Sequence, residues 1–167
     1  MSMMLRPVPL TAHAFQEFGD VIQADPSSSF GINQGTTERY HDLARVEVTP
    51  ELGGRPLINI FRCAPRDFPL DVVLMEKHPL GSQAFYPLSA RPYLVVVAPP
   101  TPTLDITKIV AFHAARDQGV NFATGVWHHP LLTLEATSDF IVVDRGDAGD
   151  NYEEVEVPSG TLTIDLD

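Results

Sequence analysis

Residues 93–98 read Tyr-Leu-Val-Val-Val-Ala, and residues 99–102, Pro-Pro-Thr-Pro, follow them immediately. A strand formed by the first run would be apolar on both of its faces, so both faces need cover from a second sheet or from another subunit. The prolines end that strand, because proline has no amide hydrogen to give to a sheet. This stretch therefore indicates a protein built from packed β-sheets.

Short β-rich runs recur on both sides of this stretch, and turn signals separate them. The chain has 15 prolines and 11 glycines, which suit the tight reversals between such runs. The predicted strands are Tyr40–Val48, Leu57–Cys63, Val72–His78, Gln83–Tyr86, Tyr93–Ala98, Ile106–Phe112, Leu131–Ala136, Phe140–Asp144 and Thr161–Leu166. Many short strands at even spacing are typical of a closed barrel or a sandwich. We expect one all-β domain over residues 1–167.

Helical signals are confined to the beginning of the chain. One short helix is predicted from Thr11 to Phe18, with Thr11 as its cap and Gly19 as its stop. The acidic end, from Asp147 to Asp167, is expected to form an outer strand or an arm.

The charge of the chain excludes some classes of partner. Asp and Glu number 22 against 11 Lys and Arg, which gives a formal net charge of -11. Such a chain repels phosphate backbones and anionic lipid, so neither nucleic acid nor a membrane is an expected partner. An anionic small substrate would need a local cationic group. The single cysteine, Cys63, rules out an intramolecular disulfide, and no long apolar run is present, so we expect a cytoplasmic protein.

Two short runs contain most of the residues capable of chemistry. They are Glu76-Lys77-His78-Pro79-Leu80-Gly81-Ser82-Gln83 and Gly125-Val126-Trp127-His128-His129-Pro130. Glu76 and His78 are two residues apart, so they share one face of a strand, and Gln83 can return beside them after the Pro/Gly turn. His129 is expected to point away from His128 if the segment is extended. A carboxylate, an amide and two imidazoles that converge can bind a metal or move a proton.

The spacing of these runs is similar to that of the two motifs of cupin barrels. The first cupin motif is His-x-His followed five residues later by Glu, and the second has a His three residues after a Gly. Glu76 and His78 fall at the two His positions, Gln83 falls at the Glu position, and His128 follows Gly125 by three. Only His78 and His128 keep the residue type of the motif. The likeness implies a cupin (RmlC-like) β-barrel with these four side chains inside it.

Longer blocks resemble the ureidoglycolate lyases, formerly called ureidoglycolate hydrolases. They are Ile32–Gly35, Glu38–Ala44, His78–Pro87, Gly119–Phe122, Val126–Leu131 and Asp144–Gly146. The resemblance runs in order over nearly the whole chain. It implies a cupin-fold homodimer that cleaves ureidoglycolate to glyoxylate and urea in allantoin degradation, with nickel as its cofactor.

The reaction implied by this resemblance suggests roles for the clustered residues. Ureidoglycolate is a hemiaminal, so breaking its C–N bond requires a base at the hydroxyl and an acid at the departing nitrogen. We predict His78, His128 and Glu76 as catalytic residues and as metal ligands. Ligand chemistry suits nickel but leaves zinc, iron and manganese open. A neutral amide is a poor ligand, so Gln83 is interpreted as a substrate-binding residue. Which imidazole is the base stays open.

The substrate carboxylate predicts an arginine partner, because a guanidinium can hold a carboxylate with two hydrogen bonds. Arg39, which shares a strand face with His41, is the first candidate, and Arg145 is the second; both are predicted to bind substrate, as is His41. Two other functions stay open. One is a different metal-dependent cupin enzyme, an oxygenase or a sugar-acid isomerase, and the missing His-x-His pair disfavours it. The other is a non-catalytic barrel that binds a small molecule.

Overall fold

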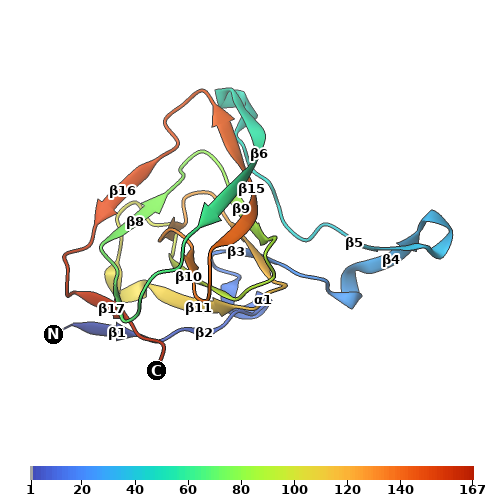
Figure 1. Ribbon diagram of the computed structural model, residues 1–167. Helices are drawn as coiled ribbons and strands as arrows, with labels where there is room; N and C mark the ends of the chain where they lie inside the picture. Colours follow the sequence, from blue (N-terminus) through green and yellow to red (C-terminus); the bar gives the residue numbers. More distant parts are fainter. Residues whose placement is uncertain (1) are drawn as a thin grey trace.

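The computed structural model describes residues 2–167 and consists mostly of strands, with one four-residue α-helix (Figure 1). The strands are β1 (Met3–Leu5), β2 (Val8–Pro9), β3 (Gly19–Ile22), β4 (Ser29–Ile32), β5 (Thr37–Tyr40), β6 (Gly54–Cys63), β7 (Leu70–Asp71), β8 (Leu74–Lys77), β9 (Gln83–Pro87), β10 (Tyr93–Ala98), β11 (Val110–Ala114), β12 (Gly119–Phe122), β13 (Trp127–His128), β14 (Leu132–Thr133), β15 (Ser138–Asp147), β16 (Glu153–Glu156) and β17 (Leu162–Ile164). The helix is α1 (Ala12–Phe15), and the 3-10 turns are η1 (Pro26–Ser28), η2 (Asn33–Gly35), η3 (Pro50–Leu52) and η4 (Ile106–Lys108).

Two large sheets form the body of the molecule. One has the order β16-β8-β13-β10-β11-β2, with β14 also pairing with β10, and the other has the order β3-β12-β9-β15-β6. A three-stranded sheet, β1-β17-β7, lies beside them, and β4 pairs only with β5. The predicted all-β class is confirmed. The ladders are those of open sheets, so the closed cupin barrel remains a prediction.

The strand β10 is buried on both faces, as its sequence predicts. Val95 and Val97 join a core cluster that includes Phe85 of β9 and Phe140 of β15, between the two large sheets. The alternate residues of β10 join a second cluster with residues of β7 and β17. The cover expected from a second sheet or a subunit is therefore supplied within the chain.

The helix is shorter than predicted. Thr11 caps it as expected, since its hydroxyl accepts a hydrogen bond of 3.1 Å from the amide of Ala14. The helix ends at Phe15, and the chain then turns so that Phe18 is buried and Gly19 begins β3. Gly19 has a φ of +141°, and a Cβ there would lie 1.9 Å from the carbonyl oxygen of Asn121. Close pairing with β12 therefore requires a glycine at this position.

Several strand boundaries differ from the predicted ones. The predicted strand 40–48 is wrong beyond Tyr40. The backbone amides of Arg45 and Glu47 donate to the side chains of Asp20 and Ser82 rather than to a neighbouring strand. The start of 106–112 is the turn η4, capped by Asp105. The predicted strands 72–78, 131–136 and 161–166 contain the shorter β8, β14 and β17, and those at 57–63 and 140–144 lie inside the longer β6 and β15. Strands at 3–5, 8–9, 19–22, 29–32, 70–71, 119–122 and 127–128 were not predicted.

The acidic end of the chain forms an outer strand, as expected. The exposed strand β16 pairs with β8 and lies at the edge of its sheet. Among residues 2–167, no helix has the length and apolar character needed to cross a lipid bilayer.

The strands β4 and β5 form a hairpin that extends away from the body (Figure 1). We call residues 29–40 the arm. Three successive residues at its tip adopt left-handed backbone angles, with φ of 52° at Asn33, 60° at Gln34 and 84° at Gly35. The arm thus reverses in a tight turn. The side chain of its middle residue, Gln34, disfavours the left-handed conformation that the turn requires.

Candidate active site

The two sequence runs meet where β13 pairs with β8. His128 and Glu76 are direct partners in this antiparallel ladder, so their side chains lie on the same face. His128 Nε2 is 3.4 Å from Glu76 Oε1. His78, just beyond β8, brings its ring centroid to 5.2 Å from that of His128. One ligand atom from each of Glu76, His78 and His128 lies within 4.8 Å of the others.

A chain of hydrogen bonds orients His78. Its Nδ1 is 2.8 Å from the carbonyl oxygen of Asn151, and its Nε2 is 3.2 Å from Gln83 Oε1. The amide nitrogen of Gln83 donates to Asp144 Oδ2 at 3.2 Å, and Asn59 donates to Asp144 Oδ1 at 2.9 Å. Asp144 accepts only, so Gln83 must present its oxygen to His78. Both ring nitrogens of His78 therefore face oxygen atoms.

His128 is the most deeply buried member of the cluster, with 2% of its surface exposed. Its Nδ1 donates to the carbonyl oxygen of Val126 at 3.0 Å, so Nε2 is the ring nitrogen that faces the cluster. Nε2 makes no hydrogen bond of acceptable geometry, although it faces Glu76. A buried imidazole nitrogen without a hydrogen-bond partner, beside a second imidazole and a carboxylate, fits a divalent transition metal.

The carboxylate of Glu76 is ionised in this setting. Burial acts to raise the pKa of Glu76, but the neighbouring His128 and His78 imidazoles and the Tyr152 hydroxyl together bring that pKa below its ordinary value. Tyr152 also donates a hydrogen bond to Glu154, and its ring centroid is 6.2 Å from that of His78. The cluster therefore contains a negative charge that can balance a cation.

The cluster opens into a small cavity of about 100 Å³. Its lining residues are Phe61, Cys63, Glu76, Gln83, Phe85, Phe122, His128, His129, Pro130 and Leu131. The walls are mainly apolar, and the Phe122 ring stacks on His128 at 4.5 Å between centroids. A few convergent polar groups in an apolar cavity are typical of a small-molecule site.

His129 lines the same cavity, so the expectation that it points away from His128 is wrong. The strand β13 ends at His128, and alternation does not continue into the following turn. His129 Nδ1 donates to the carbonyl oxygen of Pro130 at 2.8 Å, which leaves its Nε2 with a lone pair. Burial lowers the pKa of His129.

Cys63 also borders the cavity, but it is poorly suited to attack a substrate. Burial, followed by the negative charge of Asp139, raises the pKa of the thiol. The thiol therefore stays protonated, and only a thiolate is a strong nucleophile.

The three residues predicted to bind substrate from outside the two runs do not line this cavity. Arg145 is buried, and its guanidinium donates to the carbonyl oxygens of Val48 at 2.7 Å and Leu52 at 3.2 Å. Arg39 is exposed on the arm, and His41 is exposed just beyond it. The substrate-binding roles of all three remain predictions.

The sequence analysis did not predict two residues that lie near the cluster. Asn151 and Tyr152 lie in the acidic segment before β16, and Asn151 is separated from His78 by 73 positions. The side chain of Asn151 also accepts a hydrogen bond of 2.8 Å from the amide of Leu80. No local pattern marks this segment, because only the pairing of β16 with β8 brings it to the site.

Known proteins resemble this chain over most of its length. Residues 2–165 match the family model of ureidoglycolate lyase. The chain belongs to the ureidoglycolate lyase family. It is 55% identical over 157 residues to ureidoglycolate lyase of Burkholderia mallei (strain NCTC 10229), covering 94% of this chain and 91% of that protein. It is 53% identical over 152 residues to the Rhizobium etli ureidoglycolate lyase, covering 87% of each.

Among solved structures, the chain matches oxalate decarboxylase at a TM-score of 0.38 and 12% identity, covering 84% of this chain and 28% of that chain. A second structure, which concerns the Mn(II) centres of Bacillus subtilis oxalate decarboxylase, matches with the same score and identity over 90% of this chain and 30% of that chain.

Proposed function

We propose that this protein cleaves the C–N bond of ureidoglycolate, giving glyoxylate and urea, as a carbon-nitrogen (amidine) lyase of purine degradation. Membership of the ureidoglycolate lyase family over residues 2–165 supports this proposal. The observation that carries it is the cluster of Glu76, His78 and His128, two of which, Glu76 and His128, line an apolar cavity. We also propose that the chain is a single cupin-type barrel domain that works as a homodimer in the cytoplasm.

The ligands proposed for a resident metal are Glu76 Oε1, His128 Nε2 and Nε2 of His78. Nickel is the ion expected from the family resemblance, and the nitrogen and oxygen donors suit other divalent ions as well. A bound ion would lower the pKa of a hydroxyl group on the substrate and stabilise negative charge as it develops. We propose that Gln83 hydrogen-bonds a substrate group, and its contacts with Asp144 and His78 support this role.

The chemistry also requires movement of a proton. The substrate hydroxyl loses its proton, its oxygen becomes the carbonyl oxygen of glyoxylate, and the C–N bond breaks as the urea nitrogen gains a proton. Residues that transfer protons in such steps contribute about 10²–10⁴-fold each. We propose His129 as the base, because its ring is oriented by Pro130 with Nε2 unprotonated and it is not required as a metal ligand.

A direct assay tests this function. Purified protein is incubated with ureidoglycolate, and glyoxylate, urea and ammonia are each measured. We expect glyoxylate and urea in equal amounts, loss of both after treatment with a chelator, and recovery when Ni²⁺ is returned. Release of ammonia in place of urea would contradict the lyase reaction. Binding of glyoxylate without turnover would instead support the non-catalytic barrel.

The role of His129 has its own test. His129→Gln retains the size and polarity of the side chain but removes the basic nitrogen. We expect kcat to fall by about 10²-fold or more with little change in bound metal, which is measured by elemental analysis of the purified protein. An unchanged kcat would assign the base to another residue.

A further inference from the structure

The cavity lacks a cationic side chain. Among the residues that line it, within the described range 2–167, none is Arg or Lys. Arg145 is engaged with the carbonyl oxygens of Val48 and Leu52. Lys77 points to the far side of β8, where it pairs with Glu153 at 3.1 Å. A substrate with a carboxylate, which rests on the proposed function, would find no guanidinium among the described residues that line the cavity, in a chain of net charge -11. The Arg66 guanidinium does not line the cavity, although burial and, to a smaller extent, the charge of this guanidinium lower the pKa of His129.

The arm presents a free guanidinium and exposed apolar side chains. Phe30 and Tyr40 are 45% and 39% exposed, and the Arg39 guanidinium lies 5.9 Å from the centre of the Phe30 ring. Within the part of the chain that the structure describes, the arm pairs only with itself, and it extends away from the sheets that carry the cavity (Figure 1). An isolated two-stranded hairpin is marginally stable in water. This arm therefore needs a surface other than the body of its own chain.

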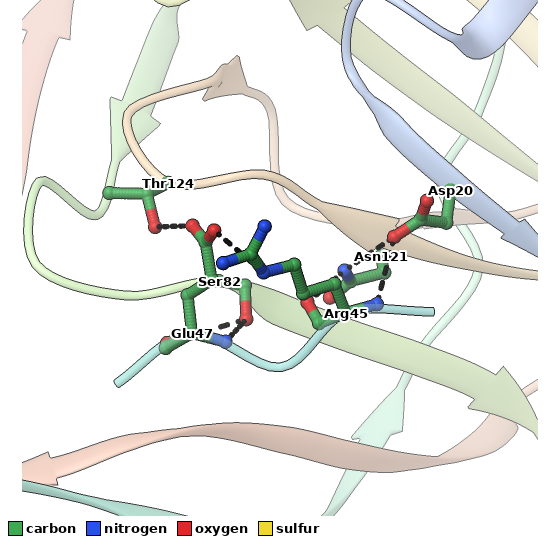
Figure 2. A network of polar contacts seen from close by, with 6 residues as sticks. All are labelled: Asp20, Arg45, Glu47, Ser82, Asn121 and Thr124. Carbon is green, nitrogen blue, oxygen red and sulfur yellow. Dashed lines mark hydrogen bonds and ion pairs between the residues drawn. The ribbon is translucent and has the colours of Figure 1, made fainter. Parts of the chain in front are cut away.

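The base of the arm is fixed to the body by a polar network (Figure 2). Asn121 of β12 donates to Asp20 Oδ2 at 3.0 Å and to the carbonyl oxygen of Arg45 at 2.8 Å, and the amide of Arg45 donates to the same carboxylate at 3.1 Å. Two residues further on, Glu47 receives a hydrogen bond from Thr124 at 2.8 Å, and its amide donates to Ser82 at 2.8 Å. The body thus fixes the direction in which the arm leaves it.

A suitable surface lies on the edge strand β6. Ile58 and Ile60 on its outer face are 75% and 66% exposed, and they pair with Val143 and Ile141 of β15. The alternate residue Phe61 lines the cavity. We call Ile58, Ile60, Ile141 and Val143 the outer patch. An apolar patch on an open edge strand is typical of a protein interface, and the opposite face of the same strand borders the cavity through Phe61.

We propose that a second copy of this chain covers the outer patch with its arm and thereby places its Arg39 at the mouth of the cavity, where the guanidinium binds the substrate carboxylate. The apolar residues of the arm can pack on the apolar outer patch. The Arg39 guanidinium complements the negative charge of the Glu76 carboxylate and of the anionic substrate at the cavity. A two-fold axis makes the exchange reciprocal, so each dimer has two complete sites.

The test uses dimers of mixed composition. Arg39→Ala and His128→Ala chains are co-expressed with different tags, and dimers with both tags are purified. In such a dimer, the chain with an intact His128 receives an intact arm from its partner. We expect about half of the wild-type kcat with the wild-type KM, because one of the two sites is complete. Arg39→Ala alone should raise KM about 10- to 100-fold.

The matched control for Arg39 is Glu38→Ala, which changes the neighbouring exposed residue of β5 and should leave KM unchanged. The inference is overturned if the mixed dimer has the KM of Arg39→Ala, or if Arg39→Ala has the KM of the wild type.

Oligomeric state provides a readout that does not depend on the reaction. Ile60→Asp should give a monomer by light scattering, whereas Val155→Asp, on the edge strand of the other large sheet, should remain a dimer. A wild-type monomer would overturn the inference about the arm. A wild-type dimer that is dissociated by Ile60→Asp but does not cleave ureidoglycolate would support the docking and contradict only the proposed function.

Discussion

The cluster at the cavity and the arm differ in how exposed their functional candidates are. The candidates of the cluster are buried or partly buried, and the candidate of the arm is exposed. His128 is 2% exposed, stacked on Phe122 and paired with Glu76 across a ladder, so the interior of the body fixes its position. Arg39 is exposed on a hairpin that only its own turn and its base hold in place. The difference teaches that one chain can fix the polar groups of its cavity by burial while it leaves a charged group exposed at the end of a hairpin.

The largest effect should come from His128. His128→Ala removes one proposed ligand and the group next to Glu76, so we expect glyoxylate formation to fall about 10³-fold or more, together with loss of bound metal. His13→Ala, on the exposed face of α1, is the control and should retain full activity. Initial rates and elemental analysis measure both effects. A His128→Ala protein with normal turnover would place the catalytic residues outside the body cluster.

Phe122→Ala tests how far packing in the body fixes the cluster. The ring is 1% exposed and stacks on His128. We expect the free energy of unfolding to fall by about 3 kcal/mol, the low end for such a change, because the ring already borders a cavity. Denaturant unfolding measures the loss. The exposed Phe30 of the arm serves as the comparison, and Phe30→Ala should cost much less in dilute protein. Equal losses at the two positions would remove the distinction between the two regions.

The polar network at the base of the arm should have a smaller effect. Asn121→Ala deletes the hydrogen bonds to Asp20 and to Arg45, which should cost about 1–3 kcal/mol. Limited proteolysis should then cut first at residues 26–45, since the arm is no longer fixed to β12. Thr36→Ala, at the tip, is the control and should not change the cleavage pattern at the base. Unchanged proteolysis of Asn121→Ala would show that the network does not hold the arm.

The smallest effect should come from Asp71, which lies outside the cluster and the arm and affects the stability of the fold at low pH. Hydrogen bonds from Thr163, Ser159 and the amide of Gly160 hold the pKa of Asp71 below the ordinary carboxyl value of 3.8. A carboxyl whose pKa is lower in the folded state stabilises the protein above pH 3.8, and this contribution disappears as the pH falls through the folded-state pKa. Asp71→Asn should therefore flatten the loss of stability on acidification below about pH 4, with KM unchanged. Thermal unfolding between pH 3 and pH 7 measures it, and an acid limb identical to that of the wild type would contradict the assignment.

Several features could be predicted because they depend on near neighbours in the sequence. The apolar run 93–98 indicates a doubly covered strand, and β10 has no exposed face. The two-residue spacing of Glu76 and His78 indicates a shared face, and both side chains reach the same cluster. Strand ends were less predictable, since 41–48 has β-like residues but bonds to side chains of other segments.

The sequence by itself determined an all-β protein and placed Glu76, His78 and Gln83 in one neighbourhood, because alternation along a strand and the length of a turn are local properties of the chain. The likeness to the cupin motifs added His128 to this group, and the pairing of β13 with β8 brings it there. Only the tertiary structure turned His129 into the cavity and engaged Arg145 with backbone carbonyl oxygens. It also separated Arg39 from the cavity of its own chain. These outcomes depend on contacts between segments far apart in the sequence, and no local pattern of residues encodes which of those segments meet.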